Sequence, residues 1–297
     1  MSEAEKHNEK GREHHEAGEN ERALDEYEAA LTLYREAGDA SGEATTLCNI
    51  AEAYLGMNER PHALKLFEKA RAMFEAAGDR KGEATAINGI GLTHAGNGEN
   101  RRAIEFYEQA LAMRREVGDS SGEAWTLSSI GRANSNMVEH DTALDYYQQA
   151  LALYRQEGDK RAEGTMLNNI GKMNDANNDR EAALAAFEEA LAARREAGDK
   201  SGEAVTLTNI GGVYSAQAER QRALEYFEQA LAIYEEPGQD QAGLVTTLTN
   251  TAGLYKALGE RRTADQYTKR AKAVGKQVKQ DTKQRKKALK NRSSWTE

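Results

Sequence analysis

The chain has 297 residues, a formal net charge of −9 and a charged fraction of 30%; with only two prolines and abundant Ala, Glu, Leu and Arg, it favours an all-helical protein and excludes a strand-rich one. No apolar run approaches the roughly 20 residues that span a bilayer, and the first twenty residues lack the apolar core of a signal peptide, so we expect a cytoplasmic protein. One cysteine, Cys48, excludes an internal disulfide and a cysteine-based zinc site and fits a reducing compartment.

One sequence pattern recurs along the chain at a spacing of 40 residues. It starts with Gly-Asp, continues in most copies with Gly-Glu-Ala, and then reaches a Leu or Ile and a second Ile three residues on. The copies begin at Gly38, Gly78, Gly118, Gly158 and Gly198. Such self-similarity is typical of repeat proteins, so we interpret the chain as one elongated stack of repeats rather than as two ordinary domains.

Each repeat is expected to contain two helices. In the repeat that begins at Gly198, apolar and small residues recur at three- and four-residue steps in two segments: Ala204, Leu207, Ile210, Gly211 and Tyr214, then Ala223, Phe227, Ala230, Leu231 and Tyr234. Each set lies on one face of a helix, and we name the two helices A and B. Gly198 is suited to end the preceding helix, and either Asp199 or Ser201 to cap helix A.

A small residue stands at one position in the middle of helix A. Glycine there costs about 1 kcal/mol relative to alanine, so a compensating interaction is needed. The residues concerned are Ala51, Gly91, Gly131, Gly171, Gly211 and Ala252. We expect close packing of helices A and B, with these residues opposed by alanines of helix B, as the compensation.

The pattern resembles the tetratricopeptide repeat. The residues that carry the resemblance in one repeat are Leu207, Ile210, Gly211, Tyr214, Ala223, Phe227 and Ala230, and seven repeats align over residues 4–275. The resemblance implies an all-α, right-handed superhelical solenoid of antiparallel helix pairs, with about seven repeats plus a C-terminal helix. The 40-residue length is similar to that of bacterial arrays found beside a CHAT protease domain, Rap-type regulators, LGN-type scaffolds and, more distantly, kinesin light chains.

The repeats are expected at residues 1–40, 41–80, 81–120, 121–160, 161–200, 201–241 and 242–275, followed by a basic helical extension and disordered tail over 276–297. The first repeat holds His7 and Lys10 at positions that are apolar elsewhere, which suits a polar end cap. Pro237 and one inserted residue shift the last repeat to a spacing of 41, so its helix pair is expected to tilt.

The resemblance implies that helix A lines a concave groove and that residues flanking its buried positions point into that groove. Amides and hydroxyls are frequent there, and they can hold the backbone of an extended peptide without reading its side chains. The candidate groove residues are Asn49, Asn88, Trp125, Ser129, Arg132, Asn168, Asn169, Lys172, Asn209 and Asn250. A simpler interpretation is that they form a wetted surface. We predict a non-catalytic scaffold for protein–protein interaction.

Two cations distinguish the central repeats. Arg132 and Lys172 occupy one position of adjacent repeats and can pair with a ligand carboxylate, so the expected partner is an extended and partly acidic protein segment. The same repeats carry Asn134 and Asn174 in place of a core tyrosine, which indicates either a functional centre or sequence drift. No metal, cofactor or catalytic group is predicted, since the histidines are scattered and Cys48 has no activating neighbour in the sequence.

The C-terminal segment is basic. Residues 261–297 carry 13 Lys or Arg against three acidic residues, a net charge of +10, which leaves −19 for residues 1–260. The candidate contact residues of this tail are Lys283, Arg285, Lys286, Lys287, Lys290, Arg292 and Trp295. The alternatives are a solubilising end, self-association with the acidic body of another copy, or an adaptor tethered to an anionic membrane or acidic filament. Nucleic acid is not expected, because the acidic body repels it.

Overall fold

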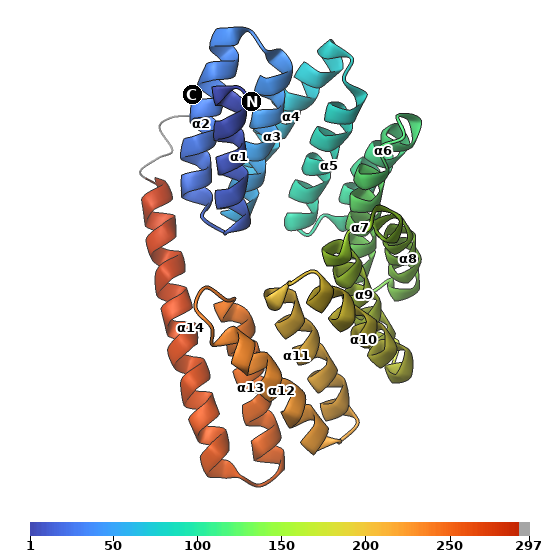
Figure 1. Cartoon of the computed structure of the whole chain (residues 1–297), viewed down its shortest axis with the longest axis vertical. Helices are drawn as coiled ribbons and strands as arrows, with labels where there is room; N and C mark the ends of the chain where they lie inside the picture. The colour runs from blue at the N-terminus through green and yellow to red at the C-terminus, as the bar shows by residue number, and fades with distance from the viewer. Residues whose placement is uncertain (291–297) are drawn as a thin grey trace. The chain divides into compact units, whose positions relative to one another are not determined.

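The computed structural model describes the backbone of residues 1–290 and the side chains of residues 1–284. That part of the chain is built from fourteen α-helices and contains no β-strand (Figure 1). In chain order the helices are α1 Glu3–Glu16, α2 Asn20–Ala37, α3 Ala40–Gly56, α4 Arg60–Ala77, α5 Arg80–Gly96, α6 Asn100–Glu116, α7 Ser120–Asn136, α8 His140–Glu157, α9 Lys160–Ala176, α10 Arg180–Glu196, α11 Lys200–Ala216, α12 Arg220–Tyr234, α13 Gln241–Ala257 and α14 Arg261–Lys290. None of the helices in the described part is long and apolar enough to cross a membrane.

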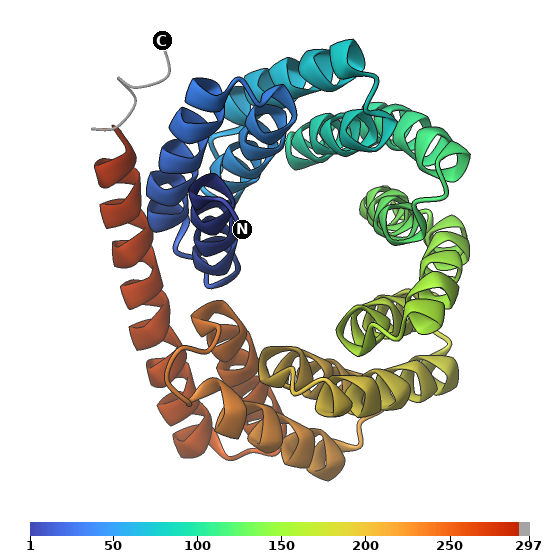
Figure 2. The same cartoon turned by 45° about the horizontal axis from the view of Figure 1, so that its top comes forward.

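The chain folds as two compact units, Met1–Leu153 and Tyr154–Glu297. In the first unit α1 packs on α2, α3 on α4 and α5 on α6, and each pair contacts the next. The second unit repeats this order with α9 on α10, α11 on α12 and α13 on α14. Figure 2 shows the same succession of pairs within each unit. Odd-numbered helices are therefore the A helices and even-numbered helices the B helices, and the predicted all-α solenoid of helix pairs is confirmed.

The Gly-Asp pair that opens each pattern ends one helix and begins the next. Gly38 and Gly78 end α2 and α4 with a left-handed φ of 69°, a conformation that glycine adopts without a steric penalty. The next residue caps the following helix: the Asp39 carboxylate accepts a hydrogen bond from the Gly42 amide at 2.9 Å. In the repeat where two caps were considered, the cap is Asp199, whose carboxylate accepts from the Gly202 amide at 3.0 Å.

The small position of helix A is explained by close packing. A Cβ atom on Gly211 would lie 2.6 Å from the Phe227 ring and 3.2 Å from the Ala223 carbonyl oxygen. The expected close approach is therefore confirmed, and the aromatic ring of helix B lies nearer than the alanine.

A second glycine of helix A allows successive repeats to pack closely. A Cβ on Gly82 would lie 2.3 Å from the Phe74 ring at the end of the preceding helix B, and one on Gly243 would lie 2.6 Å from the Tyr234 ring. The glycine of the Gly-Glu-Ala motif thus leaves room for a large side chain of the preceding repeat. Pro237 lies in the turn between α12 and α13, where the Asp240 carboxylate accepts hydrogen bonds from the Ala242 and Gly243 amides at 2.8 and 3.0 Å.

Candidate peptide-binding face

The predicted amide positions divide into buried and accessible residues. Three of the ten candidates are buried, with Asn88 0%, Ser129 2% and Asn168 5% exposed. They are not available to line a groove, which corrects the expectation for these three side chains. Asn168 faces the next A helix, where it bonds to Asn209, and the Ser129 hydroxyl donates to the Trp125 carbonyl of its own helix at 3.1 Å.

The buried amides and hydroxyls connect one repeat to the next. The Asn209 side chain donates to the Asn168 side-chain oxygen at 2.9 Å, which joins α11 to α9. The hydroxyls of Thr208 and Thr247 join α11 to α13 at 2.9 Å. Some of the amides and hydroxyls that were expected to bind a ligand therefore form hydrogen bonds between successive repeats.

The other candidates retain accessible surface. Asn49, Asn169 and Asn209 are half-buried, whereas Asn250 is exposed. Trp125 is half-buried, and the Arg114 guanidinium lies 5.2 Å from its ring centroid, so the ring takes part in packing between repeats.

The two central cations lie in different units. Arg132 is exposed in the first unit, next to the buried ring of Tyr107; burial raises the pKa of Tyr107 to about 12, and the Arg132 charge acts against that rise. Lys172 is exposed in the second unit, on α9. A single ligand for the whole predicted set stays a prediction.

The second unit has a hollow of about 510 Å³ between α11, α12 and α13. Its lining includes Gly212, Ser215, Arg220, Asn250, Gly253 and Ala257. A Cβ on Gly212 or on Gly253 would meet nothing within 4 Å, so the helix surface is bare at both positions. We name these lining residues, together with Lys172 and Asn209 on the same run of A helices, the A-helix face of the second unit.

The chemistry of this face suits a polar chain. Asn250 offers both a donor and acceptors at the surface, and Arg220 adds a positive charge. Bare glycines allow the backbone of a bound segment to approach the helix. Gly212 and Gly253 were missed as candidates; the available signal was the pair Gly211-Gly212, in which close packing between helices explains only the first glycine.

The model of the tetratricopeptide repeat family matches the chain over residues 2–76, 82–156, 136–196, 162–236 and 202–277. The chain belongs to the tetratricopeptide repeat family. This membership supports a role as a protein-interaction scaffold. No curated protein sequence matches this tetratricopeptide repeat chain.

Several solved structures share the fold of this tetratricopeptide repeat chain. BtubC (BKLC) from P. vanneervenii is 22% identical, over 75% of this chain and 91% of its own, with a TM-score of 0.63. A Rap protein complexed with competence and sporulation factor is 15% identical, over 94% of this chain and 76% of its own, with a TM-score of 0.71. A putative kinesin light chain array from Podosopora anserina is 17% identical, over 65% of this chain and 95% of its own, with a TM-score of 0.53.

The similarity to Rap-type and kinesin-light-chain arrays is thereby confirmed at the level of the fold. The similarity to LGN-type and CHAT-associated arrays stays a prediction.

Groups able to do chemistry are dispersed in the described part of this tetratricopeptide repeat chain. It contains no group of three or more His, Cys, Asp or Glu that could hold a metal ion. Cys48 is buried, and burial raises the pKa of its thiol, so the nucleophilic thiolate is disfavoured. His7 and His94 each lie beside one carboxylate, Glu26 at 2.6 Å and Glu99 at 2.8 Å.

The predicted tail contacts fall mostly outside the described residues. Lys283 is exposed on α14. The side chains of Arg285, Lys286, Lys287 and Lys290 and the whole of Arg292 and Trp295 lie outside the described residues, so the tail contacts stay predictions.

Proposed function

We propose that this chain binds an extended, partly acidic segment of a partner protein on the A-helix face of the second unit. The observation that carries the proposal is the hollow of about 510 Å³ where two bare glycines, Gly212 and Gly253, adjoin the exposed amide of Asn250. A peptide backbone can enter such a surface and exchange hydrogen bonds with the amide.

The charges on this face favour an acidic segment. Lys172 on α9 and Arg220 at the start of α12 are both exposed cations of the second unit. Successive A helices, α9, α11 and α13, contact each other. At about 8–10 Å between helix axes and about 3.3 Å per extended residue, a segment of about six residues reaches from α9 to α13.

The proposal is tested by selecting peptides from a random displayed library on the full chain and then titrating them into variants by calorimetry. Gly212→Leu should abolish binding, because the leucine side chain enters the hollow from a position where a Cβ meets nothing within 4 Å. Asn250→Ala should cost about 1–3 kcal/mol, because groups on the peptide lose their partner.

Glu228→Ala, at an exposed position of helix B, is the control and should bind like the parent. If the selected peptides bind Gly212→Leu as tightly as the parent, the A-helix face is not the binding surface.

A further inference from the structure

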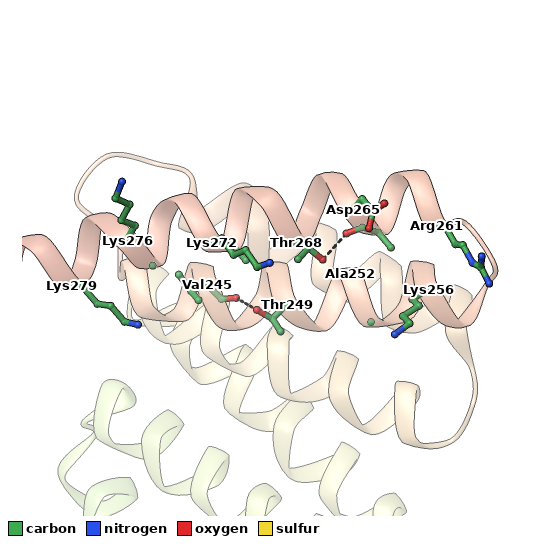
Figure 3. A pocket seen from close by; sticks show the side chains of 14 residues that line it. Val245, Thr249, Ala252, Lys256, Arg261, Asp265, Thr268, Lys272, Lys276 and Lys279 are labelled. Atoms are coloured by element: carbon green, nitrogen blue, oxygen red, sulfur yellow. Dashed lines mark hydrogen bonds between the residues drawn. The ribbon is translucent and has the colours of Figure 1, made fainter.

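A groove lies on the helix pair α13 and α14, at a place that α13 fills in the pair before it. Between α13 and α14 it has a volume of about 970 Å³ (Figure 3). Its floor is made of small or short side chains, among them Val245, Ala252, Ala264 and Ala271. The groove shares Thr249 and Gly253 with the hollow described above, and its other residues are separate.

The groove occupies the place where another A helix would pack. In the preceding pair, α11 and α12, that place is filled by α13: the Tyr234 ring lies against Gly243, and the Thr208 hydroxyl bonds that of Thr247. The equivalent of Thr208 in the last repeat is Thr249, which is exposed and donates to the Val245 carbonyl of its own helix at 2.7 Å.

The side chains that narrow this space elsewhere are replaced in α14. Aligned on Ala223 and Ala264, the residues of α12 are Phe227, Leu231 and Tyr234, and those of α14 are Thr268, Lys272 and Gly275. Three large side chains of α12 are thus replaced in α14 by a threonine, a lysine and a glycine. A Cβ on Gly275 would have Val245 at 3.9 Å as its nearest neighbour, so the space above it is free.

The rim of the groove is positively charged. Five cations line it against one carboxylate, that of Asp265. Figure 3 shows two of them, Lys256 and Arg261, at one end, and Lys276 and Lys279 at the other, with Lys272 between the helices. Among the residues that the structure describes, no carboxylate lies within 4.0 Å of any of the five.

The length of the groove matches a helix. Its lining on α14 runs from Arg261 to Lys279, which at 1.5 Å per residue is about 27 Å. The A helix that fills the preceding groove, α13, has 17 residues and is therefore of about the same length.

We propose that the α13–α14 groove binds an amphipathic helix of a partner protein, with small apolar residues along one face and Glu or Asp on both flanks. The small apolar floor receives the seam, and the unpaired rim cations receive the acidic flanks. This site shares Gly253 with the A-helix face, which is proposed to bind an extended segment, and is otherwise separate from it.

The first helix of a second copy fits this chemistry poorly. Gly42 faces the Tyr34 ring and Thr46 accepts from Asn8 of the preceding pair; at the equivalent positions α1 and its cap carry Ser2 and Lys6. They form no apolar seam, and a lysine would approach the cationic rim. A partner helix with an apolar seam is therefore the better match.

The test uses a fluorescent, lactam-stapled helix of 17 residues with Ala and Leu on one face and Glu on both flanks. A second probe carries Lys in place of every Glu. Fluorescence anisotropy with the full chain should show saturable binding of the acidic probe, at least tenfold tighter than that of the basic probe and weakened by salt.

Matched variants locate the binding. Lys272→Glu with Lys276→Glu should weaken the acidic probe at least tenfold and strengthen the basic one. Arg262→Glu with Lys269→Glu makes the same charge change at exposed positions outside the groove and should alter binding less than threefold. Gly275→Leu, which fills the groove, should also weaken the acidic probe at least tenfold, whereas Gly212→Leu should leave it unchanged.

The proposal would be overturned if the acidic probe did not bind or if both probes bound equally. It would also be overturned if the two charge-reversed double variants lost affinity for the acidic probe to the same extent. Analytical ultracentrifugation distinguishes the other occupant: self-association that Gly275→Leu abolishes would assign the groove to a second copy instead. These outcomes do not test the A-helix face, which is tested separately with the selected peptides and Gly212→Leu.

Discussion

Neighbouring glycines in α11 allow the close packing of helices to be tested with one substitution at two positions. Gly211→Leu removes a mid-helix glycine, which by itself favours the helix by roughly 0.8–1 kcal/mol. Its Cβ, however, would lie 2.6 Å from the buried Phe227 ring and 3.2 Å from the Ala223 carbonyl oxygen, and a backbone oxygen cannot rotate away. Overpacking costs about 1–3 kcal/mol, and displacing the Phe227 ring adds part of its burial energy of roughly 1.5–3 kcal/mol. We expect a net loss of about 2–3 kcal/mol.

Gly212→Leu is the matched control, because it makes the same change one residue on, where a Cβ meets nothing within 4 Å. It should leave stability unchanged or raise it by up to about 1 kcal/mol. The assay is urea unfolding followed by far-ultraviolet circular dichroism, with thermal melts of the same variants. Since repeat arrays can unfold in parts, midpoints are compared between the two variants rather than converted to absolute free energies. Equal midpoints for Gly211→Leu and Gly212→Leu would refute the packing assigned to helices A and B.

Three further predictions concern the buried polar groups. Asn168→Ala should lower the free energy of unfolding by about 1–3 kcal/mol, because the bond between α9 and α11 is lost, and urea titration would contradict this if the midpoint stayed at that of the parent. Cys48 should resist alkylation by iodoacetamide in the native protein up to pH 9 and react on addition of urea, since burial disfavours its thiolate; rapid native labelling, read by mass spectrometry, would show that it is accessible. Burial raises the pKa of Glu203, but the hydrogen bonds and charges of Arg195 and Lys200 lower it by more than burial raises it. The pKa of Glu203 therefore lies below its ordinary value. Its stabilising contribution is therefore present above about pH 4.5 and lost as pH falls through the lowered pKa, so Glu203→Gln should flatten the acid limb of a stability-versus-pH curve, and an unchanged limb would argue against the ion pairs.

Local interactions explain why so much of the fold could be predicted from the sequence. Helix periodicity, the Asp caps and the left-handed glycines each depend on residues within a few positions of one another, and the 40-residue spacing repeats them along the chain. Asp39 and Gly38 perform the roles that their residue types indicate. The small position at Gly211 was also predictable, because an uncompensated glycine inside a helix needs a packing partner.

The tertiary structure decided which of the candidate asparagines face a neighbouring repeat and which face solvent. Asn168 and Asn169 are adjacent in the sequence, yet the first is buried against the next repeat and the second keeps accessible surface. Successive residues differ in direction by about 100° around a helix, so which of them meets a neighbour depends on how successive pairs pack. That packing is a property of two repeats together, and one repeat's sequence does not specify it.

The two proposed binding surfaces also depend on contacts between repeats. The repeat register singles out Gly211 as the packed position, but it does not show that the surface at Gly212 is bare; that follows from the tertiary structure, in which a Cβ on Gly212 meets nothing within 4 Å. Likewise, Gly275 marks an open groove because no A helix packs above it in the described part of the chain, whereas the equivalent Tyr234 packs against α13. The sequence by itself determined the helices, their caps and their pairing, since these follow from local periodicity. The tertiary structure decided which faces remain free to bind, because a face is free only where no neighbouring helix covers it.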